Sequence, residues 1–186
     1  GQTWDATGMQ FGITDNKMVN KVIIHPTYTD SLFAVTDKNI KISADGGQTW
    51  SNALTSSGST MIGRFRDIEF KPNNPNILYA VKQTTGSSEV YKSTDRGLSW
   101  SSAMNGISLV NRNRPLLAVT PANPDVVYVL FCKNDYGFHG IYKSTDNADS
   151  WTLQSDSPNI LGRSTDGTST GGQSWYDLSL GVSTED

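Results

Sequence analysis

The sequence predicts an all-β protein made of repeated four-stranded antiparallel units, and three observations support this. Tryptophans recur at positions 4, 50, 100 and 151, so the chain repeats itself about every 50 residues. Each repeat contains short β-branched or aromatic runs separated by turn-forming residues. No segment shows the 3.6-residue apolar period of an amphipathic helix. Four short strands in a repeat of this length are typical of a β-propeller blade, and the chain holds about three and a half blades of a larger ring.

The repeat that starts at Asp67 shows the expected strands most clearly. Residues 67–71 alternate apolar and polar side chains, as a half-buried strand does. A Pro-Asn-Asn-Pro turn follows, and then a β-branched and aromatic run that is typical of a buried strand. A polar loop separates this run from two further strands. The four strands expected in this repeat are 67–71, 77–82, 89–93 and 98–103.

A short string of residues ends at each tryptophan. Its copies occupy residues 43–50, 93–100 and 144–151, and its last half opens the chain at 1–4. Ser and Asp accept hydrogen bonds from backbone N–H groups in tight turns, Gly permits an unusual backbone, and Trp buries a large ring between sheets. We therefore expect a structural role, rather than a metal-binding or catalytic one, for Ser43, Asp45, Gly47, Trp50, Ser93, Asp95, Gly97, Trp100, Ser144, Asp146 and Trp151. Ala148 replaces the glycine in the third copy, where we expect a strained or altered turn.

The repeats also divide the chain. We expect residues 1–20 to end a preceding blade, and residues 177–186 to form the first strand of the next one. Between them lie three blades, 21–66, 67–115 and 116–176, the last with a long Ser/Gly-rich loop. Because three blades alone would leave strand edges unpaired, the expected first partner is the remainder of the propeller in a longer chain, or another copy.

The string S-x-D-x-G-x-T/S-W resembles the Asp-box of bacterial neuraminidase (BNR) repeats, a family that includes sialidases, sortilin-type receptors and xyloglucanase-like glycoside hydrolases. With the upstream pattern x-P-x-N-P-x-x-x-Y, the chain is most similar to the xyloglucanase-like and sortilin-like propellers. Asp-boxes occur in enzymes and in binding proteins, so the resemblance implies the fold rather than an activity. Residues 137–142, 158–162 and 171–178 resemble segments of large secreted bacterial proteins, some exported by the type IX pathway. This implies a secreted or cell-surface location, with the export signal outside this segment.

Strand direction separates two faces of the predicted propeller. The boxes share one face with the Pro-Asn turns, and the irregular loops, which suit function better, share the other. Aromatic rings there could stack on sugars while arginines bind their oxygens. The candidate ligand-binding residues are Arg64, Arg66, Arg112, Arg114, Tyr136, His139, Trp175 and Tyr176. The alternative is that the arginines only solvate the loops and Trp175 packs between blades.

Two loop acids are weak catalytic candidates, Asp37 and Asp135. Asp37 lies where xyloglucanase-like enzymes hold a catalytic Asp, but the Gly-Gly pair that follows it in that family is absent. An inverting glycosidase needs a second carboxylate about 6.5–9.5 Å away, and Asp135 is one candidate among several. Arg64-Phe65-Arg66 does not reproduce the signature of a sialidase.

Composition excludes several classes of function. The net charge of −3 argues against nucleic acid as a partner. No apolar run reaches the roughly 20 residues of a membrane helix, and one cysteine rules out an internal disulfide framework. We expect no cofactor and no metal, and we expect His25 to be an exposed turn residue. The sequence therefore predicts a non-catalytic protein that binds a polysaccharide or a protein. The alternatives are part of a glycoside hydrolase acting on a β-glucan-type polysaccharide, or a scaffold that spaces other domains.

Overall fold

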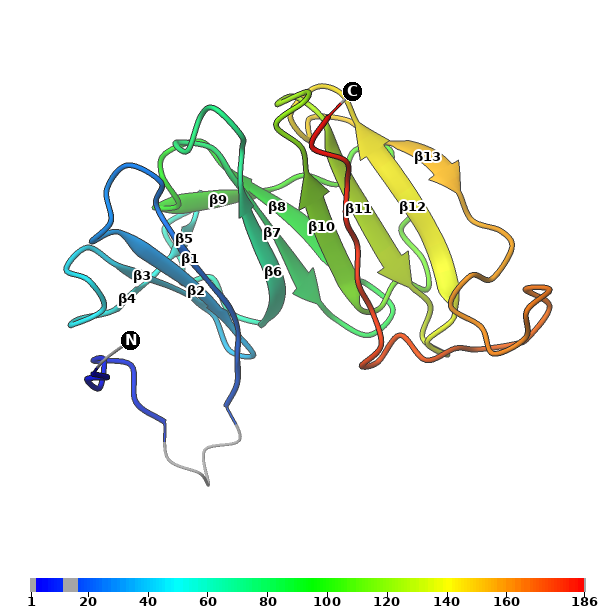
Figure 1. The fold of residues 1–186 in the computed structure, drawn as a ribbon, viewed down its shortest axis with the longest axis horizontal. Helices are drawn as coiled ribbons and strands as arrows, with labels where there is room; N and C mark the ends of the chain where they lie inside the picture. The colour runs from blue at the N-terminus through cyan, green and yellow to red at the C-terminus, as the bar shows by residue number, and fades with distance from the viewer. Residues whose placement is uncertain (1–2, 12–16, 186) are drawn as a thin grey trace.

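The computed structural model describes residues 3–11 and 17–185, and the regular elements within them are all β-strands. They form three sheets that stand side by side in chain order, one for each repeat (Figure 1). The all-β prediction is confirmed.

Each sheet is an antiparallel meander whose strands follow the order of the chain. The first contains β1 (Val19–Ile24), β2 (Leu32–Thr36), β3 (Ile40–Ser43) and β4 (Ser51–Asn52). The second sheet contains β6 (Arg64–Phe70), β7 (Leu78–Gln83), β8 (Glu89–Ser93) and β9 (Ser99–Ser102). The third sheet contains β10 (Pro115–Val119), β11 (Val127–Cys132), β12 (Phe138–Ser144) and β13 (Thr152–Ser155). A short strand, β5 (Leu54–Thr55), leaves the first sheet and pairs in parallel with β9. These sheets have the form of propeller blades.

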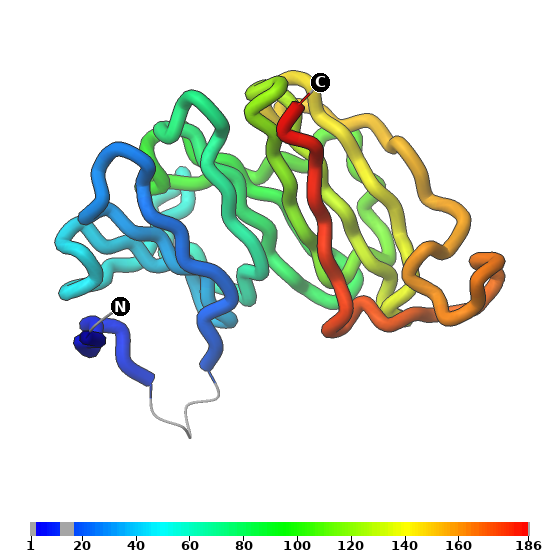
Figure 2. The backbone as a smooth tube through the Cα atoms, viewed as in Figure 1, coloured from blue at the N-terminus to red at the C-terminus, as the bar shows by residue number. Residues whose placement is uncertain are grey.

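The apolar cores lie between neighbouring blades. Phe33 of the first blade packs in one buried cluster with Phe65 and Trp100 of the second. Tyr79 of the second blade packs in another with Trp151 of the third. The face of each sheet is therefore buried by the next sheet. Figure 2 shows the sheets as adjacent layers of the tube. The box tryptophans contribute large rings to these contacts.

The boxes form the expected turns. In the first box, Asp45 accepts hydrogen bonds from the Thr49 N–H at 2.9 Å and the Ser43 hydroxyl at 2.8 Å. The Ser43 hydroxyl oxygen in turn accepts the Gly47 N–H at 2.8 Å. The same three bonds recur in the second and third boxes. One serine and one aspartate thus organise each turn.

Each box is also bonded to the turn between the first two strands of its own blade. The bonds run from Gly46 N–H to Asp30 O at 2.9 Å, from Arg96 N–H to Asn76 O at 2.9 Å, and from Asn147 N–H to Asp125 O at 3.1 Å. Boxes and first turns therefore share one face, which we call the box face. The loops between the second and third strands, and those between blades, lie on the opposite loop face.

The third box differs from the others in its tryptophan. Ala148 is buried and has φ +66°, a conformation that costs an alanine energy. The Trp151 indole N–H donates to Ala103 O in the preceding blade, at 2.9 Å. In the first box the Trp50 indole instead donates to Gly47 O within its own turn. The expected altered turn is thus visible in how the box docks on its neighbour.

His25 is buried, and the expectation of an exposed turn residue was wrong. Its Nδ1 accepts the N–H groups of Thr27 and Tyr28 at 3.2 and 3.1 Å. Its ring centroid lies 5.5 Å from that of Phe70 in the second blade. Because neighbouring blades meet at this turn, the imidazole is enclosed by a residue far away in the sequence.

The two ends of the chain lie outside the regular strands. Residues 177–186 are expected to form a strand, but the described part of this segment has no strand pairing and instead runs along the third blade (Figure 1). The Thr120 hydroxyl donates to Ser183 O, and Leu178 and Leu180 pack against the buried cluster of Leu130, Cys132 and Phe138. The half box at 1–4 falls partly outside the described residues, and Trp4 is 90% exposed.

Candidate functional site

Two adjacent first strands on the loop face each contain a β-bulge at the same place. The register of β1 shifts between Val19 and Lys21, and that of β6 between Phe65 and Asp67. The extra residues are therefore Asn20 and Arg66. A bulge changes the direction in which a side chain leaves a strand and is common next to binding sites. The two re-aimed side chains meet, because Arg66 Nη1 donates to Asn20 Oδ1 at 3.2 Å.

A chain of amide side chains extends this contact across the three blades. Asn20 Nδ2 donates to Phe65 O at 2.7 Å, which links the first blade to the second. Arg66 Nε donates to Gln83 Oε1, and Gln83 Nε2 donates to Asn113 Oδ1 ahead of the third blade at 2.7 Å. Arg66 is therefore held in place by neutral oxygens.

Three guanidinium groups gather around this chain. Burial, together with the positive charges of Arg64 and Arg114, lowers the pKa of Arg66 to about 10, while the carboxylate of Asp37 opposes the shift. The ion pairs found among the described residues involve lysines and none of these arginines. Three cations with one nearby acid leave an excess of positive charge. This part of the loop face can therefore attract an anionic group.

An aromatic surface adjoins the arginines. Arg114 Nη1 donates to Ser174 O at 3.1 Å and to Trp175 O, and so fixes the segment that follows the Ser/Gly-rich loop. The rings of Trp175 and Tyr176 lie 4.2 Å apart between centroids at 69°, and Tyr136 lies 6.5 Å from Trp175. Their exposed fractions are 58%, 55% and 40%. Three contiguous exposed rings beside guanidinium groups can stack on a ligand and bind its oxygens.

Arg112 and His139 do not belong to this group. Arg112 is 3% exposed, and its Nε donates to Ser88 O at 2.8 Å, so it ties two loops together. His139 is half-buried with Nε2 3.0 Å from Val110 O, and burial lowers its pKa. It lines a separate cavity of about 290 Å³ next to Tyr142. Of the eight candidates, the structure therefore brings together Arg64, Arg66, Arg114, Tyr136, Trp175 and Tyr176.

The two acidic candidates have backbone partners. Asp37 Oδ1 accepts the Met18 N–H at 3.1 Å, and the Asp37 N–H donates to Met18 O at the same distance. Asp135 Oδ1 accepts the Gly137 N–H at 3.0 Å inside its own turn. Both carboxylates shape loops, and Asp37 also lies near the arginines.

Sequence reasoning missed the neutral members of the site, Asn20, Gln83 and Asn113. Only Asn20 left a signal, because it precedes Lys21 exactly as Arg66 precedes Asp67 in the next repeat. The bonds of Gln83 and Asn113 depend on how one blade docks on the next, which no local pattern encodes.

Within residues 3–11 and 17–185, no group of three or more His, Cys, Asp or Glu side chains is placed to hold a metal ion. The same residues form no helix with the length and apolar character needed to cross a membrane.

Comparison with protein families gives one match that covers most of the chain. The Sortilin-Vps10 model (sortilin, neurotensin receptor 3) matches residues 1–114 and, in a second overlapping register, residues 38–161. Two overlapping matches are expected when a repeat pattern is aligned one blade further along. No curated protein matches the chain.

Solved structures of larger propellers resemble the chain. An ancestral GH74 enzyme superposes with a TM-score of 0.58 at 22% identity, over 72% of this chain and 18% of that one. The GH74 xyloglucanase from Xanthomonas campestris gives 0.56 at 15% identity, over 71% and 20%. YCF48 bound to D1 peptide gives 0.51 at 16% identity, over 86% and 46%. The chain thus spans about a fifth of the GH74 enzymes and less than half of YCF48, and the predicted propeller of Asp-box type is confirmed.

Proposed function

The chain belongs to the Sortilin-Vps10 family, and on that premise we propose that it is a non-catalytic binding region of a secreted or cell-surface propeller protein. Its ligand is a glycan that carries acidic groups, bound on the loop face. The observation that supports this most is that Arg64 and Arg114 lie near enough to Arg66 to lower its pKa, while Arg114 holds the backbone of the exposed Trp175–Tyr176 segment.

The chemistry of the site favours an acidic glycan over a neutral one. Sugar rings present apolar C–H faces that pack on aromatic rings, and their carboxylates or sulfates suit guanidinium forks. Arg66 is already oriented by Asn20 and Gln83, so little side-chain entropy is lost when it binds an anion. A protein segment with acidic side chains could bind to the same arginines. The experiment below distinguishes this alternative from an acidic glycan.

A binding assay with three immobilised probes tests the proposal. The probes are polygalacturonate, which is acidic, xyloglucan, which is neutral, and poly-glutamate, which is acidic but has no sugar. We expect binding to polygalacturonate that weakens with added salt and falls at least about tenfold in Arg64→Ala and in Trp175→Ala. Both side chains are exposed, so the variants should fold.

Arg163→Ala is the matched control, because Arg163 is exposed beside the Ser/Gly-rich loop and its substitution removes the same positive charge as Arg64→Ala. An equal loss in the control would show that only net charge matters and would contradict a defined site. Preference for poly-glutamate would identify a protein ligand instead. Location is tested separately, by following the native protein in culture supernatant, membrane and cytoplasmic fractions.

A glycoside hydrolase is the second candidate function. Asp37 lies on the loop face, close enough to Arg66 to oppose the lowering of the pKa of that guanidinium. The propeller fold is also that of GH74 xyloglucanases. Release of reducing ends from xyloglucan that is abolished by Asp37→Asn would support this candidate. If xyloglucan is unchanged after prolonged incubation, hydrolysis of this polysaccharide is contradicted and the non-catalytic binding role remains.

A further inference from the structure

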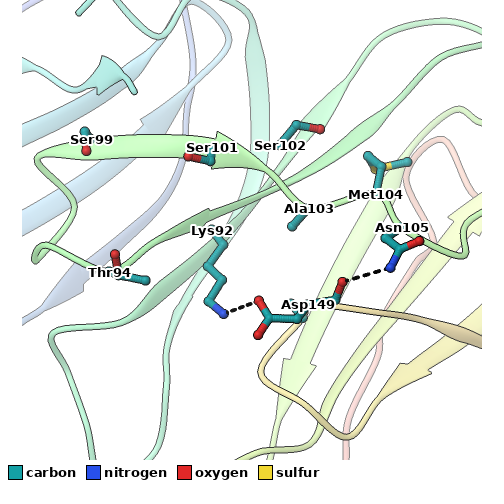
Figure 3. A pocket seen from close by; sticks show the side chains of 10 residues that line it. Lys92, Thr94, Ser99, Ser101, Ser102, Ala103, Met104, Asn105 and Asp149 are labelled. Carbon is teal, nitrogen blue, oxygen red and sulfur yellow. Dashed lines mark hydrogen bonds and ion pairs between the residues drawn. The ribbon is translucent and has the colours of Figure 1, made fainter. Parts of the chain in front are cut away.

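A cleft on the box face lies between the second and third blades, where the third box departs from the repeat. It has a volume of about 290 Å³ and is closed on one side by β8 and β9 and on the other by the turn of the third box. Figure 3 shows Lys92 of the second blade pointing toward Asp149 of the third, with the other labelled residues around them. The loop-face site described above lies on the opposite side of the molecule and shares no residue with it.

Comparison of the two blade junctions shows which residues change at the cleft. The residue before the first serine of the box is Ile42 in the first blade and Lys92 in the second. The residue two positions before the box tryptophan is Leu98 in the second box and Asp149 in the third. The two positions are apolar at the first junction and form an ion pair at the second, where Lys92 Nζ lies 2.7 Å from Asp149 Oδ1.

The backbone contact between the blades changes with these residues. At the first junction, Leu54 and Thr55 pair as a strand with β9, and the Ser56 N–H donates to Trp100 O at 2.9 Å. At the second, the Trp151 N–H donates to Asn105 O at 2.9 Å and Asn105 Nδ2 donates to Asp149 O at 3.4 Å, in addition to the Trp151 indole bond to Ala103 O. The exit segment of the second blade therefore forms no strand beside the third box, and the cleft opens there.

Backbone strain accompanies the change. Ala148 has φ +66°, whereas the same position in the other two boxes is a glycine, Gly47 or Gly97. The position before it has a positive φ in all three boxes, so Ala148 alone sets the third box apart. Non-glycine residues in this region cost energy and are concentrated at sites where function requires them. Box three keeps its Ser–Asp hydrogen bonds in spite of this strain.

The lining of the cleft is polar but carries no net charge. Hydroxyl groups come from Thr94, Ser101 and Ser102, and an amide comes from Asn105. Ser99 also lines the cleft, but its hydroxyl donates to Asp95 Oδ2 at 2.6 Å. An ammonium has three N–H donors and a carboxylate has two acceptor oxygens, and the ion pair uses one of each. The Asp149 carboxylate disfavours an anionic ligand, and the hydroxyl groups disfavour an apolar one. Adjacent donors and acceptors match the neighbouring hydroxyls of a neutral sugar ring.

We propose that this cleft binds a single neutral sugar ring, through Lys92, Asp149 and the hydroxyls of β9. Its volume lies at the lower limit of about 300 Å³ for small-molecule sites, which restricts the ligand to about one ring. No aromatic side chain lines the cleft, so the hydroxyls of the sugar supply the contacts. A ligand of this size should bind weakly, with a dissociation constant on the order of 1–10 mM.

The test is a titration of the isotope-labelled 186-residue chain, followed by backbone amide chemical shifts. The probes are the methyl β-glycosides of glucose, galactose and mannose, each to about 50 mM, and inorganic phosphate in a parallel series. We expect saturable shifts for at least one glycoside in residues 99–105 and 147–150, and unchanged shifts in residues 174–176 of the loop-face site. No saturable shift with any glycoside, or stronger binding of phosphate at the same amides, would overturn the proposal.

The variant that removes the site replaces its two charged residues by the apolar residues found at the equivalent positions of the first junction. Lys92→Ile with Asp149→Leu restores the residues found at Ile42 and Leu98, so the repeat itself predicts that it folds. The double variant should abolish the glycoside-induced shifts. If it loses the dispersed spectrum of a folded protein, the single variant Asp149→Leu is used instead and should weaken binding by about tenfold or more. Lys143→Ile is the matched control, because Lys143 precedes its box serine as Lys92 does but lies outside the cleft. Equal loss in this control would contradict the assignment to the cleft.

Discussion

At the scale of single residues, each box aspartate acts as an acceptor that holds one turn. Hydrogen bonds from the hydroxyl and N–H of Ser150 and from Ser144 lower the pKa of Asp146 to about 2. The corresponding bonds lower the pKa of Asp45 to about 2. Because both values lie below the unfolded value near 3.9, their stabilisation is present above that pH and is lost only as the pH falls toward 2. The boxes therefore do not titrate near neutral pH.

His25 introduces the pH dependence that the boxes lack. Burial, and then the charge of Arg96, lowers the pKa of His25 below 6.5. The unfolded chain therefore takes up a proton before the folded chain does, and stability falls as the pH drops from about 7 toward 5. Chemical denaturation at a series of pH values measures this as a falling midpoint.

Replacement of His25 by Asn should reduce this dependence, since an Asn side chain can accept the same turn N–H groups without titrating. The part that remains comes from His139, whose pKa is lowered by its own burial. The double variant with His139→Gln should then lose the fall in midpoint between pH 7 and pH 5, and the raised pKa of Glu69 can only shift the midpoint upward toward pH 5. A slope equal to that of the unaltered chain would refute the role given to these imidazoles.

At the scale of elements, the fifth residue of each box turn lies against the preceding blade, and the space left by that blade decides which side chain the position tolerates. Gly97 has φ +76°, and a Cβ there would lie 2.5 Å from Phe33 Cε1. The same position in the third box holds Ala148, whose methyl group is part of the core between the second and third blades. The glycine is needed where an aromatic ring of the neighbouring blade approaches the turn, and it is dispensable where the neighbour leaves space.

Exchange of the two residues tests this difference. Gly97→Ala should lower the free energy of unfolding by about 2 kcal/mol or more, because backbone strain adds to overpacking against Phe33. Ala148→Gly relieves strain but removes a buried methyl group, and these effects of about 1 kcal/mol each should nearly cancel. Urea denaturation of both variants measures the two changes. Equal losses would show that the turn alone, and not its neighbour, sets the requirement.

At the scale of the whole molecule, one buried carboxylate connects all three blades. Asp67 on β6 accepts the Leu117 N–H of the third blade at 3.0 Å through Oδ2. Its Oδ1 accepts from Lys21 Nζ of the first blade at 2.8 Å. Lys21 also contacts Glu69, and burial raises the pKa of that carboxyl while Lys21 opposes the rise. The first strands of the blades are therefore joined by side chains, since they do not pair with one another.

Removal of Asp67 should weaken the whole assembly. Asp67→Ala leaves the Leu117 N–H buried without an acceptor and removes one of the two carboxylate partners of Lys21, and we expect a loss of about 3 kcal/mol in the free energy of unfolding. Lys21→Met removes only the more exposed partner and should cost less. Thermal and urea unfolding measure both changes. A loss below about 1 kcal/mol for Asp67→Ala would show that apolar packing alone joins the blades.

The sequence by itself determined the repeats, the strands of each blade and the box turns. These features depend on residues close together in the chain, such as Ser43 with Asp45 or the alternation from Asp67 onward. It also pointed to the loop face, and six of its eight ligand candidates lie together there.

Only the tertiary structure decided how those residues are used. Arg112 and Arg114 look alike in the sequence, yet one is buried between loops and the other holds the aromatic segment. His25 is buried because a second blade covers it, and the cleft at Asp149 exists because two blades meet there without pairing. Contacts between blades join residues about 50 positions apart, so their geometry follows from how whole sheets dock rather than from any local pattern.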